Sequence, residues 1–140
     1  MRYYLDTNTV IFMLFDKQEG DNIKREVLYL LKDYENTFYV SSIAMRELVK
    51  LYNDGELKSR MYKSYKDMFT LIDGLNYEVK PFTKQHVMAY AEFTPSGDHK
   101  DPNDHMIIAQ AISDRIPLIS SDNKFKLYEK QGLRLVFNKR

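Results

Sequence analysis

Acidic side chains follow two of the short apolar runs in this sequence. Asp6 comes directly after the run at residues 2–5, and Asp122 comes just after the run at residues 116–120. If both runs are parallel strands of one sheet, their carboxyl ends lie at the same edge, where ligands bind in open α/β sheets. We therefore expect both carboxylates at that edge.

Three further acids belong to expected helices. Glu47 lies about a turn and a half into the helix after the second strand, and Asp101 and Asp104 begin the helix before the fourth. Each acid also has a plainer interpretation, because Asp is favoured at helix N-termini by free N–H groups and by the helix dipole, and Glu47 fits a solvated helix face. If the first and fourth strands are neighbours, however, all five acids can converge on one pocket.

Carboxylates gathered in one pocket repel one another, so they cannot all be charged without compensation. A divalent cation provides that compensation, and Mg²⁺ prefers oxygen ligands of this kind. Such an ion lowers the pKa of a bound water and stabilises charge that develops on a phosphodiester during in-line attack. This chemistry needs no covalent intermediate, which fits a chain without Cys and without a recognisable nucleophile arrangement.

The elements that must position these acids alternate along the chain. Five short apolar or aromatic runs predict strands at residues 2–5, 37–40, 77–82, 116–120 and 133–137. Between them, apolar residues at helical spacing predict helices over 22–35, 43–52, 57–72, about 84–93, and from 102 onward, with a short helix before the last strand. Strands separated by helical crossovers predict a three-layer α/β/α sandwich around a mainly parallel five-stranded sheet.

Composition narrows the class of protein. The chain has 140 residues, 44% of them hydrophobic, which supports one domain over residues 1–140 with a real core. A formal net charge of +1 argues against a protein that holds nucleic acid by bulk electrostatics. The apolar run at residues 10–15 is far shorter than a membrane span, so we expect no membrane association and a cytoplasmic location.

Four segments, in order along nearly the whole chain, carry a resemblance to a known family. They read YLDTN at residues 4–8, SIAMREL at 42–48, HKDPNDHMIIAQA at 99–111 and LISSDNKF at 118–125, of which the third is the most specific. The sequence resembles PIN-domain ribonucleases, most closely the VapC-type toxins of bacterial or archaeal toxin–antitoxin pairs.

The resemblance implies roles for particular residues. The four acids of the family correspond to Asp6, Glu47, Asp104 and Asp122. By this carry-over, Asp6, Asp104 and Asp122 are metal ligands, and Glu47 is a ligand or orients the attacking water. Asp101 is auxiliary, and Asn8 and Ser120 support the carboxylates; Ser120 stands where Thr is commoner and keeps the hydroxyl.

The resemblance also implies activity and partners. It points to a Mg²⁺- or Mn²⁺-dependent endoribonuclease whose sheet has the strand order 3-2-1-4-5. It implies a homodimer and a cognate antitoxin that inserts a segment into a groove near the site. The alternative is a PIN-like RNA- or protein-binding module that has lost activity, although all four acids are present.

Other side chains suggest weaker hypotheses. A basic cluster around Tyr62 and Tyr65 fits either RNA contact or a solvated helix face, and it contains Lys58, Arg60, Lys63 and Lys66. His99 and His105 flank Asp101 and Asp104, which leaves open a supporting or substrate-binding role. Acid–base cleavage by His86, His99 and His105 without a metal would leave the carboxylates without a function.

Two other α/β/α classes fit less well. A phospho-acceptor receiver domain needs a phosphorylatable Asp at the end of the third strand, where this chain has Pro81-Phe82. A haloacid-type phosphatase places a second Asp two residues after the first, where this chain has Asn8.

Overall fold

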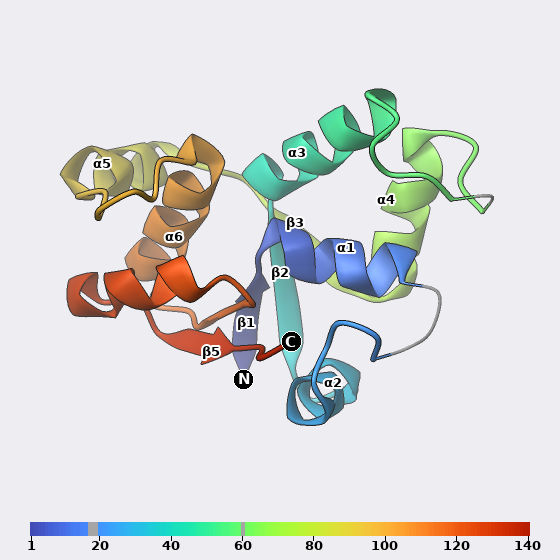
Figure 1. Ribbon diagram of the computed structural model, residues 1–140, viewed down its shortest axis with the longest axis horizontal. Helices are drawn as coiled ribbons and strands as arrows, with labels where there is room; N and C mark the ends of the chain where they lie inside the picture. The colour runs from blue at the N-terminus through green and yellow to red at the C-terminus, as the bar shows by residue number, and fades with distance from the viewer. Residues whose placement is uncertain (17–19, 60) are drawn as a thin grey trace.

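The computed structural model describes residues 1–16, 20–59 and 61–140. Its centre is a five-stranded parallel sheet in the order β3-β2-β1-β4-β5 (Figure 1). The strands are β1 (Arg2–Leu5), β2 (Thr37–Ser41), β3 (Tyr77–Lys80), β4 (Leu118–Ser120) and β5 (Leu135–Phe137). The predicted fold class and strand order are therefore confirmed.

The central strand β1 pairs with β2 on one side and β4 on the other. Leu5 lies opposite Val40 in β2 and Ile119 in β4, and all three side chains are fully buried. Runs of this kind, buried on both faces, are typical of parallel sheets covered by helices. Because β1 and β4 are neighbours, the residues that follow them lie side by side.

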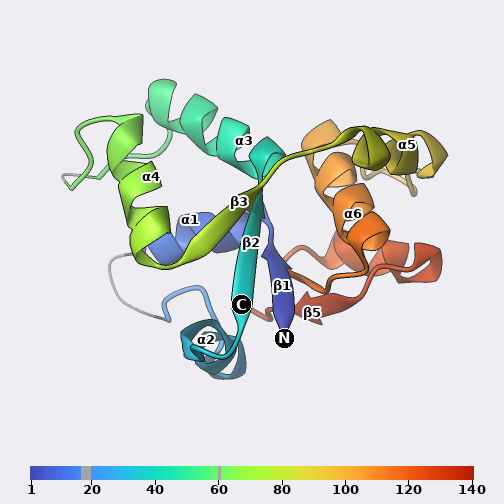
Figure 2. The same cartoon turned by 180° about the vertical axis from the view of Figure 1, so that it is seen from behind.

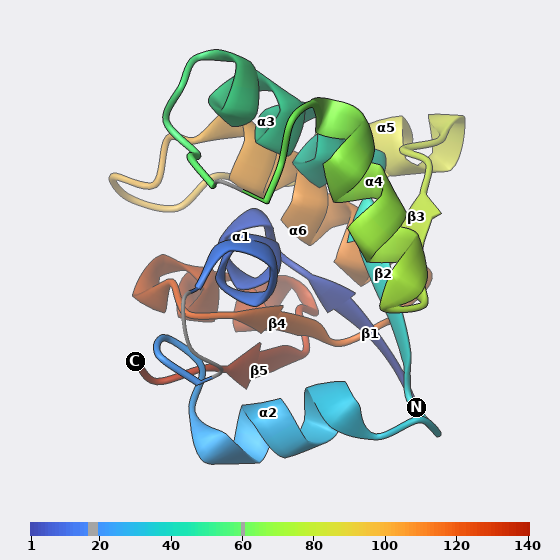
Figure 3. The ribbon, with the colours of Figure 1, turned by 90° about the vertical axis from the view of Figure 1, so that its right-hand side faces the viewer.

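Helices connect the strands and cover the sheet. They are α1 (Thr7–Phe15), α2 (Arg25–Lys32), α3 (Ser42–Asn53), α4 (Tyr65–Gly74), α5 (Lys84–Glu92), α6 (Pro102–Asp114) and the 3₁₀ helix η1 (Asn123–Gln131). In Figure 3, β4 and β5 lie between α1 and α2. Seen from behind, β3 leads from α4 on one side of the molecule to α5 on the other (Figure 2).

Capping residues define several helix starts where the sequence predicts them. Ser41 caps α3 by accepting a hydrogen bond from the Ile43 N–H, and Thr83 forms a capping box with His86 at the start of α5. Asp101 caps α6, with Pro102 in the first turn. These side chains satisfy N–H groups that have no partner within the helix.

The helix predicted over residues 57–72 is wrong in its first half, because α4 begins only at Tyr65. Ser64 caps it by accepting from the Lys66 N–H. Upstream, the Tyr62 side chain is buried and its hydroxyl donates to the Leu14 carbonyl at 2.5 Å. A buried contact with α1 therefore overrides the helical spacing of Leu57 and Met61.

This correction also removes the predicted basic helix face. Lys58 and Lys63 lie outside any helix, and Arg60 lies outside the described residues. Tyr62 is buried, so its ring is unavailable to stack on an RNA base.

Other predicted boundaries are too long. Helix α2 covers Arg25–Lys32 instead of 22–35, and Tyr34, expected on its apolar face, is 98% exposed. Strands β3, β4 and β5 lose two residues each at the ends where Pro81, Ile116 and Leu133 lie. Within residues 1–16, 20–59 and 61–140, every helix is too short or too polar to traverse a bilayer.

Candidate active site

A pocket of ≈ 230 Å³ lies where β1 and β4 end, and all five acids singled out from the sequence line it. Asp6 follows β1, Glu47 projects from α3, Asp101 and Asp104 begin α6, and Asp122 follows β4. The rest of its lining is Thr7, Asn8, Leu51 and Phe125. Acids that are up to 116 residues apart in the chain, Asp6 and Asp122, therefore meet in one small cavity.

Asp6 is fixed by hydrogen bonds on both of its carboxylate oxygens. Oδ1 accepts from the Thr9 backbone N–H at 2.9 Å and from the Thr9 hydroxyl at 2.6 Å. Oδ2 accepts from the Ser120 hydroxyl at 2.6 Å. Asp6 is therefore both the N-cap of α1 and a buried carboxylate in the pocket, held in one orientation by β4.

Ser120 also links Asp6 to Asp122. The Ser120 hydroxyl oxygen accepts a hydrogen bond from the Asp122 backbone N–H at 3.1 Å, and the same hydroxyl donates its proton to Asp6. Asp122 Oδ1 in turn accepts from the Lys124 N–H at 2.9 Å and caps η1. The small polar residue at the end of β4 thus organises both acids, and a Thr hydroxyl could do the same.

Glu47 and Asp101 both contact the first turn of α6. Asn103 donates from Nδ2 to Glu47 Oε2 at 3.4 Å, which connects α3 to the first turn of α6. Asp101 is exposed, and its Oδ1 accepts from the backbone N–H groups of Asn103 and Asp104 at 2.9 and 3.5 Å. Asp101 therefore caps α6, as the plainer interpretation of its sequence position predicts.

Asp104 contacts a buried histidine. His99 Nε2 lies 3.0 Å from Asp104 Oδ2, and His99 Nδ1 lies 2.7 Å from the Tyr128 hydroxyl. The sequence left the role of His99 open, and the structure places it directly against one of the predicted metal ligands. His105, by contrast, donates to the His99 carbonyl at 2.8 Å and contacts none of the five acids.

The acids of the pocket interact electrostatically. The pKa of Asp104 is raised to about 8, mainly by burial and in addition by the negative charges of four neighbours, namely Asp101, Asp6, Glu47 and Asp122. Burial likewise raises the pKa of Asp6, against the opposing effect of its hydrogen bonds from Ser120 and Thr9. The free pocket is therefore short of positive charge at neutral pH.

The donor set fits a hard divalent cation. The pocket presents carboxylate oxygens and the Asn8 side chain, and two of the carboxylates are held by hydrogen bonds before any ion binds. A carboxylate oxygen of Asp104 and one of Asp122 lie within 4.8 Å of each other. Asp6 and Glu47 line the same cavity, so the residues present are able to hold Mg²⁺ or Mn²⁺.

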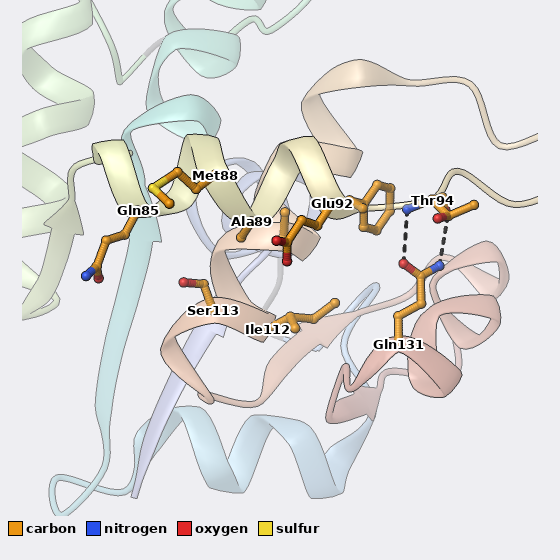
Figure 4. A pocket seen from close by; sticks show the side chains of 10 residues that line it. Gln85, Met88, Ala89, Glu92, Thr94, Ile112, Ser113 and Gln131 are labelled. Carbon is orange, nitrogen blue, oxygen red and sulfur yellow. Dashed lines mark hydrogen bonds between the residues drawn. The ribbon is translucent and has the colours of Figure 1, made fainter.

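A larger cavity of ≈ 740 Å³ lies elsewhere, between α5, α6 and η1 (Figure 4). Gln131 closes one end of it through two hydrogen bonds with the Thr94 backbone, at 2.8 and 3.1 Å. Met88, Ala89 and Ile112 line its interior, and Glu92 is the one acid among the described residues that line it. We place the chemistry in the smaller pocket because the acids converge there.

Two elements of the site were missed from the sequence. Thr9 anchors Asp6 through both its backbone and its side chain, and Tyr128 reaches Asp104 through His99. The position of Thr9 three residues after a capping Asp was a usable signal. Tyr128 gave none, because it lies 29 residues from His99 and meets it only through folding.

Comparison with known proteins points to one family. A family model described as "PIN domain" matches residues 3–131. The structure of VapBC2 from Rickettsia felis bound to a promoter DNA fragment matches with a TM-score of 0.67 and 25% identity, over 99% of this chain and 100% of that chain. No curated protein matches the chain.

Two further solved structures share the fold. DNA-bound VapBC from Salmonella typhimurium matches with a TM-score of 0.66 and 23% identity, covering 98% of both chains. VapBC-1 from nontypeable Haemophilus influenzae matches with a TM-score of 0.66 and 22% identity, again over 98% of both chains.

Proposed function

Since the chain belongs to the PIN domain family, we propose that it is a Mg²⁺- or Mn²⁺-dependent endoribonuclease that acts as the toxin of a toxin–antitoxin pair. We include in this proposal that residues 1–140 act as a single domain and that Asp6, Glu47, Asp104 and Asp122 form the catalytic site. The observation that carries it is the convergence of these four acids in one pocket at the ends of β1 and β4.

In this proposal, Asp6, Asp104, Asp122 and Glu47 hold the ion or ions, directly or through water. A bound divalent ion supplies positive charge to the phosphodiester and lowers the pKa of a coordinated water. Glu47 lines the same pocket as Asp6, and in this proposal its carboxylate orients the attacking water or accepts its proton. Ser120 and Thr9 keep the Asp6 oxygens from rotating.

The N-termini of α1, α6 and η1 also support the proposal. Asp6, Asp101 and Asp122 are their N-caps, so the positive ends of three helix dipoles lie at the acidic pocket. These ends partly offset the repulsion between the carboxylates. They also favour the approach of an anionic RNA backbone, which a wholly acidic pocket would repel.

The similar structures support the proposal of an antitoxin partner. The similar structures include VapBC assemblies and a toxin–antitoxin complex from Klebsiella pneumoniae. We propose that this chain likewise binds a cognate antitoxin. The homodimer stays a prediction, which light scattering of the purified chain tests directly.

The test of the activity is cleavage of RNA by the purified chain without its antitoxin. We expect cutting with Mg²⁺ or Mn²⁺, no cutting with a chelator, and restored cutting when the ion is returned. Asp6→Asn and Asp104→Asn should both abolish it while circular dichroism shows an intact fold. His86→Gln is the matched control, because His86 also contacts a carboxylate but lies outside the pocket.

Failure of the test has a defined meaning. If the folded parent chain, shown to be free of antitoxin, leaves every RNA intact in Mg²⁺ and Mn²⁺, the alternative of an inactive binding module replaces the nuclease. If Asp104→Asn cuts as fast as the parent, the assignment of Asp104 is wrong.

A further inference from the structure

A chain of hydrogen bonds leads from the loop before α6 to Asp104. The Ser96 backbone N–H donates to the Tyr128 hydroxyl oxygen at 3.2 Å, and that hydroxyl lies 2.7 Å from His99 Nδ1. His99 Nε2 then lies 3.0 Å from Asp104 Oδ2. The chain joins η1, the loop and α6 at a carboxylate that the proposed function places at the metal.

Packing fixes the His99 imidazole in this position. The side chain is buried, and its ring centroid lies 4.8 Å from that of His105, 5.4 Å from Tyr128 and 5.8 Å from Phe125. The backbone is held as well, because His105 Nε2 bonds to the His99 carbonyl at 2.8 Å. The imidazole therefore has one orientation available to it.

The same geometry argues against His99 as a metal ligand. Both ring nitrogens already have partners, so coordination would require the loss of the contact with Asp104 or with Tyr128. Among the described residues, Asp104 lines the acidic pocket and His99 does not. His99 thus lies behind Asp104 relative to the pocket.

We propose that His99 and Tyr128 are positioning residues that orient Asp104 for metal binding, an inference that rests on the proposed function. Because the Ser96 N–H occupies a lone pair of the Tyr128 oxygen, the hydroxyl proton is directed to Nδ1. Nε2 then carries the ring proton and donates to Asp104 Oδ2. This bond fixes the carboxylate and leaves Oδ1 for the ion, as hydrogen bonds behind metal ligands generally do.

Mn²⁺ affinity, measured from the electron paramagnetic resonance signal of the free ion, tests this role without reference to cleavage. Tyr128→Phe keeps the ring and removes only the hydroxyl, so it should fold and bind Mn²⁺ about tenfold more weakly. His99→Phe, which removes the donor to Asp104, should weaken binding by at least as much. His99→Gln restores a donor near the position of Nε2 and should recover most of the affinity.

Two control variants separate positioning from general packing. Tyr77→Phe removes a buried hydroxyl that has no hydrogen-bond partner among the described residues, and it should leave the Mn²⁺ affinity unchanged. His86→Phe removes the donor of the other buried histidine–carboxylate contact, in which Nε2 lies 2.8 Å from Asp114, and should also leave the Mn²⁺ affinity unchanged. Equal weakening in these controls would overturn the inference.

A spectroscopic measurement reports on the same bond in the unmutated chain. With saturating Mg²⁺, long-range ¹H–¹⁵N correlation spectra should show His99 with its proton on Nε2 and none on Nδ1. The opposite tautomer would overturn the inference, because Asp104 would then receive no hydrogen bond from His99.

The outcomes distinguish this inference from the proposed function. If the parent chain binds Mn²⁺ and cuts RNA, but Tyr128→Phe and His99→Phe bind the ion as tightly as the parent, only the positioning role is wrong. If the parent chain binds no Mn²⁺, the metal-dependent function and the inference that rests on it both fail.

Discussion

Helix α6 carries a buried histidine–carboxylate contact at each of its ends. At the C-terminal end, Asp114 lies 2.8 Å from His86 Nε2 and accepts a second hydrogen bond from the Tyr4 hydroxyl. At the N-terminal end, Asp104 has the contact with His99. Asp104 also faces four other carboxylates, those of Asp6, Glu47, Asp101 and Asp122.

The environments of Asp104 and Asp114 are the reverse of what the dipole of α6 would provide. A helix dipole stabilises an acid in the first turn and disfavours one in the last turn. Yet Asp114 is supplied with donors on both oxygens, whereas burial and surrounding charge raise the pKa of Asp104 to about 8. Such an excess of negative charge in a cavity is typical of a functional site and not of a structural contact.

The largest expected difference between the two ends is in catalysis. Asp104→Asn should reduce RNA cleavage to background, because it removes a proposed metal ligand. Asp114→Asn should cut within a few-fold of the parent when assayed well below its unfolding temperature, because Asp114 lies outside the pocket. Single-turnover cleavage with saturating Mn²⁺ measures both, and loss of activity in Asp114→Asn alone would reverse our assignment.

The same pair of variants should have opposite effects on stability without metal. At pH 8, Asp104→Asn should raise the free energy of unfolding by about 2 kcal/mol, because it relieves repulsion and burial of charge. Asp114→Asn should lower it by about 1–3 kcal/mol, because it leaves the donors of Tyr4 and His86 poorly matched. Urea unfolding in chelator measures both values, and two changes of the same sign would contradict the comparison.

Bound metal should stabilise the protein through the N-terminal end of α6 only. Mg²⁺ at one hundred times its dissociation constant should stabilise the parent by about 2.7 kcal/mol, because it binds the folded state. Asp114→Asn should keep this increment, and Asp104→Asn should lose most of it. Thermal unfolding with and without Mg²⁺ makes the comparison, and an equal shift in Asp104→Asn would contradict it.

The most gradual effect is the pH dependence of stability in the metal-free chain. Because the folded pKa of Asp104 is raised, the folded state holds a proton that the unfolded state has released between about pH 4 and pH 8. The ionisation of Asp104 therefore does not affect the free energy of unfolding below pH 4. It lowers that free energy progressively as the pH rises, and the loss is complete above pH 8. The difference in unfolding free energy between Asp104→Asn and the parent should grow over this range, and a constant difference would contradict it.

Much of the fold was predictable because local sequence signals coincide with the observed strands and helix starts. Apolar runs marked all five strands, and Ser41, Thr83 and Asp101 marked the starts of three helices. The failure over residues 57–64 has a tertiary cause: the Tyr62 side chain is buried against α1, which helical periodicity cannot reveal.

The candidate site was likewise predictable from the sequence only in part. The ends of β1 and β4 place Asp6 and Asp122 together by topology alone, and motif resemblance added Glu47 and Asp104. The resemblance also named Ser120 as a support of the carboxylates, but the sequence did not show which atoms these supporting residues bond. Thr9 and Ser120 bond Asp6, and Tyr128 reaches Asp104 through His99, in contacts that exist only after packing.

The most direct test of the central claim is an anomalous-difference map from a crystal of the chain soaked in Mn²⁺. The account predicts a peak within the acidic pocket, in contact with the carboxylates of Asp6, Asp104 or Asp122. A pocket without a peak, at an Mn²⁺ concentration that supports cleavage in solution, would contradict it.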